Sequence, residues 1–109
     1  MCKLLCKLHL QRLKGQNMLK RFVIERNIAG IGNFTDSEFC AAARASNTVI
    51  SDMKEFVQWQ HSYIADNKTF CVYLAESEQA VREHAEKSGM PADVVTEVSN
   101  IIDPLAGND

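Results

Sequence analysis

The chain has 109 residues, enough for one domain with one hydrophobic core. Hydrophobic residues make up 46% of the sequence and charged residues 24%, which is ordinary for a globular protein. No apolar run approaches the roughly 20 residues that a membrane span needs. The net charge is −2, and the acidic balance of residues 18–109 offers no evident surface for nucleic acid.

The charge is unevenly distributed along the chain. Residues 1–17 contain four basic and no acidic side chains, whereas the remaining residues contain 8 basic and 14 acidic ones. We therefore interpret residues 1–17 as a basic appendage outside the fold and expect a single domain over residues 18–109. The leucines of the appendage leave open a short amphipathic helix that touches a membrane surface.

Cysteine spacing indicates a reducing compartment. The four cysteines include no CxxC pair and match neither a zinc framework nor a disulfide scaffold. We therefore expect a cytoplasmic protein. Cys40 falls in an alanine-rich helical pattern, where helix packing is its expected role.

The first elements follow from alternation and capping. Leu19–Ile28 is predicted as a strand, with Phe22 and Ile24 on one face and Val23 and Glu25 on the other.

A helix is predicted to follow from about residue 36, because Thr35 and Glu38 form a capping-box signature. We expect it to end between Val49 and Lys54.

The next stretch, Val57–Leu74, is predicted to be a hairpin around the polar turn Ala65–Lys68. It contains one of the three His, one of the four Cys, both Tyr and the only Trp of the chain. Because strands hold side chains rigidly, a functional site here would be well positioned.

The sequence does not decide the register of this hairpin. A four-residue loop pairs His61 with Val72 and Ser62 with Cys71, whereas a one-residue bulge would place His61, Cys71 and Tyr73 on the same face.

The chain ends with a second helix and a last strand. Ser77 is a suitable N-cap and Gly89 a suitable C-terminal residue for the helix. Val94–Ile102 is predicted as the strand, and Asp103–Pro104 ends it. The order β-α-β-β-α-β predicts an α+β, ferredoxin-like fold, with a four-stranded antiparallel sheet and two helices on one face.

The opposite face of this sheet is expected to carry Val23, Tyr73 and aromatic neighbours. These side chains are too apolar to leave in water, so we predict a homodimer that forms through this face.

Several of these segments together resemble a family of small bacterial proteins. The matching residues are Arg21-Phe22-Val23-Ile24-Glu25-Arg26, Val57-x-Trp59-x-His61-Ser62-Tyr63, Asp66-x-Lys68-x-Phe70-Cys71-Val72-Tyr73-x-Ala75, Ala80-Val81-Arg82-Glu83-His84-Ala85, Gly89-x-Pro91-Ala92 and Glu97-Val98. The family was long catalogued as a domain of unknown function and is now associated with a nickel-responsive, nickel-binding member. The resemblance covers about residues 18–104. It implies a ferredoxin-like fold, often described as a dimeric α+β barrel, with nickel as the bound metal.

His61 is the first candidate metal ligand, because neutral imidazole suits nickel and similar ions. The alternative is a sheet histidine that is hydrogen-bonded to a neighbour. His84 is the second candidate, with Glu83 or a group from another chain beside it. A partly buried helix histidine is the alternative there.

The remaining candidates also have two interpretations each. Glu25 and Glu97 are predicted on apolar strand faces, either as a carboxylate ligand or general base near His61 or in salt bridges with Arg26 or Arg82. Cys71 is either a thiolate ligand or a small buried hydrophobe. Tyr63, Tyr73 and Glu97 are candidates for lining a ligand cavity, and core packing is the alternative for the two tyrosines.

Three functions remain open from the sequence. The first is a small dimeric metal-binding protein, nickel-binding or nickel-responsive, with His61 as principal ligand. The second is an enzyme of the dimeric α+β barrel type acting on a small organic substrate, with His61 as the acid–base group. The third is a domain that only mediates association.

Overall fold

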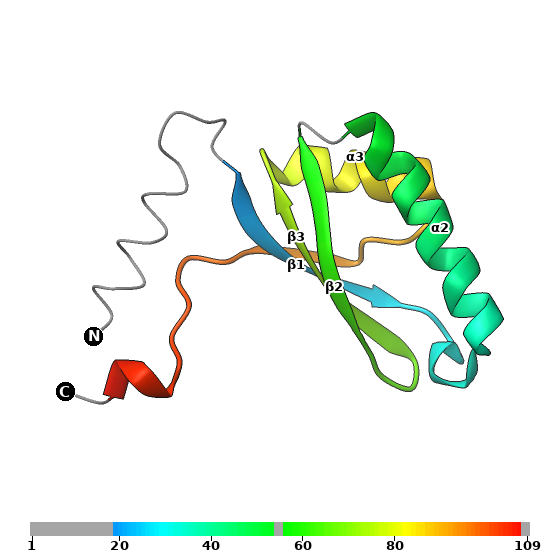
Figure 1. Ribbon diagram of the computed structural model, residues 1–109, viewed down its shortest axis with the longest axis horizontal. Coiled ribbons are helices and arrows are strands. Elements are labelled where there is room, and N and C mark those ends of the chain that lie inside the picture. The colour runs from blue at the N-terminus through cyan, green and yellow to red at the C-terminus, as the bar shows by residue number, and fades with distance from the viewer. Residues whose placement is uncertain (1–18, 54–55, 108–109) are drawn as a thin grey trace.

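Figure 1 shows the computed structural model of the chain, which describes residues 19–53 and 56–107. The predicted basic appendage, residues 1–17, lies outside the described residues. No helix in the described part of the chain combines the length and apolar character needed to cross a membrane.

The strands form one antiparallel sheet. They are β1 (Lys20–Asn27), β2 (Val57–Ile64), β3 (Lys68–Ala75) and β4 (Val94–Glu97), in the spatial order β2-β3-β1-β4. Helices α2 (Asp36–Met53) and α3 (Glu78–Ser88) lie on one side of the sheet (Figure 1). Two 3-10 turns are also present, η1 (Ile31–Asn33) and η2 (Pro104–Gly107). The predicted ferredoxin-like α+β fold is confirmed.

Both helices begin at their predicted capping residues, and α3 ends at the predicted Gly89, while α2 ends at Met53, within the expected range Val49–Lys54. Thr35 donates its backbone N–H to Glu38 Oε1 at 2.9 Å, and the Glu38 N–H donates to Thr35 Oγ1 at 3.2 Å, which closes the predicted capping box. Ser77 Oγ accepts the Ala80 N–H at 3.1 Å at the start of α3. Gly89 ends that helix at a φ of 72°, where any side chain would be strained.

Alternation along β1 decides which of its side chains are buried. Phe22, Ile24 and Arg26 face the helices and are at most 1% exposed. Val23 and Glu25 face the other way, as predicted, and they are half-buried. The rest of the main core cluster comes from the other strands and both helices: Met53, Val57, Cys71, Tyr73, Ala75 and Val81.

The hairpin register decides which face His61 occupies. His61 pairs with Val72 and Ser62 pairs with Cys71, as a four-residue loop requires. A bulge does occur, but it falls between Trp59 and His61 rather than nearer the turn. His61 therefore lies on the face without helices, whereas Cys71 lies on the helix side.

The prediction that Tyr73 lies on the sheet face opposite the helices is wrong. Tyr73 pairs with the inward-facing Phe22 and is 2% exposed beneath the helices. Because side chains alternate along a strand, Val72 and Leu74 take the outer face instead.

β4 is shorter than the predicted strand Val94–Ile102. It ends at Glu97, opposite Phe22, and the Val98 N–H makes one further bond to the carbonyl of Arg21. β1 begins only two residues beyond Phe22, at Lys20, so it offers no partner for most of the predicted extension to Ile102.

The predicted packing role of Cys40 is also wrong, because Cys40 is exposed on α2. The stripe of α2 that faces the sheet passes through Phe39, Ala43, Ser46 and Met53, and Cys40 lies beside it.

The opposite side of the sheet, which we call the helix-free face, carries an apolar stripe. Its half-buried members are Val23, Phe70, Val72 and Leu74, and its exposed ones are Tyr63 and Val94. Neither α2 nor α3 covers this face (Figure 1). A contiguous apolar surface of this kind is typical of an interaction site.

Candidate functional site

His61 is an exposed side chain of β2 on the helix-free face. Its Nε2 lies 3.2 Å from Tyr63 Oη, and the two rings meet edge to face with centroids 5.0 Å apart. Tyr63 is 62% exposed, so this pair is open to solvent. An exposed imidazole beside a phenol can bind a metal ion or an organic ligand without any change in the core.

His84, on α3, has the opposite surroundings and is only 1% exposed. Its Nε2 lies 3.3 Å from Ser46 Oγ, and its ring is 5.1 Å from that of Tyr73. Burial lowers the pKa of His84, and the nearby Arg26 cation lowers it further, against the opposing effect of a hydrogen bond with Ser46. His84 is therefore a neutral core histidine, and its Nδ1 has no hydrogen-bond partner in the described structure.

Arg26 joins this buried network. It is 1% exposed, and it donates from Nη1 to the Pro91 carbonyl at 2.6 Å and from Nη2 to Tyr73 Oη at 3.3 Å. Burial raises the pKa of Tyr73, although the Arg26 charge opposes that shift. Residue type alone does not mark Arg26 or Ser46 as members of such a network. The signal available for Arg26 is its alternation with Phe22 and Ile24 along β1.

The candidate carboxylates do not gather around His61. Glu25 lies on the helix-free face and pairs with Lys68 at 3.4 Å, while Glu97 lies opposite Phe22 on the helix side and is exposed. Glu25 and Glu97 therefore occupy opposite faces of the sheet. The salt-bridge partner of Glu25 is Lys68 rather than Arg26 or Arg82.

The other two candidate ligands are also separated from His61. Glu83 is exposed on α3 and pairs with Lys87 at 3.1 Å. Cys71 is buried on the helix side, with its Sγ 3.6 Å from Thr69 Oγ1. Its surroundings are those of a small buried hydrophobe.

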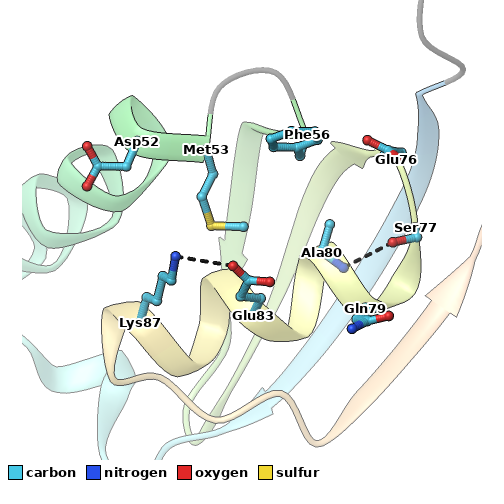
Figure 2. A pocket seen from close by; sticks show the side chains of 9 residues that line it. All are labelled: Asp52, Met53, Phe56, Glu76, Ser77, Gln79, Ala80, Glu83 and Lys87. Carbon is cyan, nitrogen blue, oxygen red and sulfur yellow. Dashed lines mark hydrogen bonds and ion pairs between the residues drawn. The ribbon is translucent and has the colours of Figure 1, made fainter.

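A pocket of about 310 Å³ lies between the end of α2 and the length of α3. Figure 2 shows Met53 and Phe56 on one side of it, Glu83 and Lys87 on α3, and Ser77 just before that helix. Glu83 is the only candidate residue among its lining. Tyr63 and Tyr73 lie on opposite faces of the sheet, so they do not line a common cavity.

A metal site needs several ligand side chains close together. Within residues 19–53 and 56–107, no three His, Cys, Asp or Glu side chains come close enough together to hold a metal ion. His61 fits as one exposed nitrogen ligand, and water or a second chain would have to supply the others.

The sequence and the fold both resemble those of known proteins. A family model described as nickel responsive protein SCO4226-like matches residues 22–98, while a comparison with curated proteins gives no match. The fold is similar to the crystal structure of SCO4226 from Streptomyces coelicolor A3(2), with a TM-score of 0.64 and 24% sequence identity, covering 75% of this chain and 99% of that chain. Since the family model spans the sheet from Phe22 to Val98 and both helices, the chain belongs to the SCO4226-like family of nickel responsive proteins.

Proposed function

We propose that the protein is a small dimeric metal-binding protein and that nickel is the metal it binds. The exposed position of His61 carries this proposal, because it leaves an imidazole open to solvent beside Tyr63. Family membership supports nickel as the ion. The buried His84 is better explained as part of the core.

Dimerisation supports the metal site in this proposal. One imidazole is too few ligands for a selective site, and Glu25, on the same face, belongs to β1, with β3 between it and the β2 strand of His61. A dimer formed through the helix-free face would bring side chains of a second copy close to His61. Metal binding and dimerisation would then strengthen each other by mass action.

We also propose that the protein is cytoplasmic. Cys40 is a free, exposed thiol and Cys71 a free, buried one, and such thiols suit a reducing compartment.

Nickel titration calorimetry, with elemental analysis of the native protein, tests the metal site. We expect His61→Ala to weaken nickel binding by roughly tenfold or more, a loss of about 1.4 kcal/mol. Cys40→Ala, which removes another exposed potential ligand, should bind as wild type does. If His61→Ala binds nickel as tightly as wild type, the proposed site is wrong.

Binding should also weaken as the solution becomes more acidic, because protons compete with the metal for imidazole. Calorimetric titrations at several pH values would measure this loss. Binding that is unchanged between pH 7.5 and 5.5 would exclude a histidine ligand.

Light scattering tests the association. We expect a dimer at micromolar concentration, because the apolar stripe on the helix-free face is otherwise left in water. A stable monomer under these conditions would contradict the dimer.

A further inference from the structure

Residues 99–107, which we call the C-terminal arm, leave the sheet after β4 and run away from both helices (Figure 1). Three large aliphatic side chains of the arm are exposed: Ile101 at 45%, Ile102 at 72% and Leu105 at 61%. Three such residues within five positions form a concentrated apolar surface beyond the sheet and helices α2 and α3.

The backbone of the arm is held by local hydrogen bonds rather than by the sheet. The Ile101 N–H donates to Asn100 Oδ1 at 2.8 Å, and the Leu105 N–H donates to Asp103 Oδ1 at 3.0 Å. The Ala106 N–H closes a turn onto the Asp103 carbonyl at 3.0 Å. These bonds shape the arm but bury none of its large aliphatic side chains.

Among residues 19–53 and 56–107, the chain therefore has two apolar surfaces that neither helix covers, the arm and the helix-free face. The length of the arm is similar to the width of the sheet in a second molecule. The five residues before η2 can reach roughly 17 Å when extended, and four strands spaced about 4.8 Å apart span about 15 Å. The arm is thus long enough to cross the sheet of a neighbouring molecule.

We propose that the C-terminal arm of one protomer packs Ile101, Ile102 and Leu105 against the helix-free face of a second copy. This inference rests on the proposed dimer and adds the segment that covers its interface. Two-fold symmetry makes the exchange reciprocal, so each copy gives one arm and receives one. The whole arm lies beyond the family match, which ends at residue 98.

Sedimentation equilibrium of the full chain tests the exchange. The arm variant is the double substitution Ile101→Asp and Ile102→Asp, and the face variant is Leu74→Asp. Ile64→Asp is the matched control, because Ile64 is a similarly exposed aliphatic residue, at 47%, on the helix side of β2. Circular dichroism of each variant confirms that the domain is folded.

We expect the dimer dissociation constant to rise by roughly tenfold or more in both the arm and face variants, equivalent to about 1.4 kcal/mol. The control should keep the wild-type value. If the face variant dissociates while the arm variant does not, the arm inference is wrong and the dimer stands. If the wild-type protein is monomeric, the proposed dimer and the proposed arm exchange are both wrong. An arm variant with a lower melting temperature and unchanged association would place the arm on its own chain, which also overturns the inference.

Discussion

Two histidine–tyrosine pairs lie on opposite faces of one sheet. His84 and Tyr73 have ring centroids 5.1 Å apart and are 1% and 2% exposed beneath the helices. His61 and Tyr63 have centroids 5.0 Å apart, but they lie on the helix-free face, where Tyr63 is 62% exposed. The same two residue types therefore stabilise the core on one face and remain available to a ligand on the other. The side of the sheet, rather than the residue type, separates the two roles.

Removing the two tyrosines should give the largest contrast. Tyr73→Ala leaves a cavity in the core and removes an acceptor of Arg26, so we expect it to lower the free energy of unfolding by about 3–5 kcal/mol. Tyr63→Ala should change it by about 0.5 kcal/mol or less. Urea unfolding monitored by circular dichroism measures both values. Comparable losses would show that the outer pair is also part of the core.

Arg26 and Glu25 are adjacent residues of β1 that also lie on opposite faces of the sheet. Arg26→Ala leaves the Pro91 carbonyl and the Tyr73 hydroxyl without their buried donor, and should cost about 3 kcal/mol. Glu25→Ala removes only a partly exposed ion pair with Lys68, which is typically worth about 1 kcal/mol or less. The same unfolding experiment compares them. An equal cost would mean that the two faces are not as different as their burial indicates.

The pH dependence of stability should depend on His84. Burial holds its pKa below the ordinary value of about 6.5, so the unfolded chain binds more protons than the folded one below that pH. The stabilisation from neutral His84 is therefore complete above about pH 6.5 and is lost as the pH falls toward the lowered pKa. Unfolding free energies between pH 7.5 and 5 would measure this slope.

Matched histidine variants identify the residue responsible. His84→Gln should flatten the slope between pH 7.5 and 5, and His61→Gln should retain it. A slope that survives in His84→Gln would assign the effect to another group.

Local signals predict the fold well because they act over a few residues. The Thr35–Glu38 capping box, the Ser77 cap and the alternation of β1 each depend on neighbours in the sequence. Tertiary partners decide the rest. The length of β4 depends on where β1 begins, and the position of Cys40 depends on which stripe of α2 meets the sheet.

The candidate site is predicted less completely for the same reason. The sequence identifies His61 and His84 as candidates, but the hairpin register and the packing of α3 decide which one is exposed. The inward position of Tyr73 and the bond from Arg26 to Pro91 also depend on contacts between distant segments.

Nuclear magnetic resonance of the histidine side chains during nickel addition tests most directly whether the exposed His61 binds the metal. Histidine signals are assigned with the His61→Gln and His84→Gln variants, and zinc serves as a diamagnetic comparison. We expect the His61 ring signals to broaden or shift at substoichiometric nickel, while those of His84 stay unchanged because the core excludes the ion. Unchanged His61 signals in excess nickel, or a response at His84 instead, would contradict the assignment of the exposed pair to metal binding.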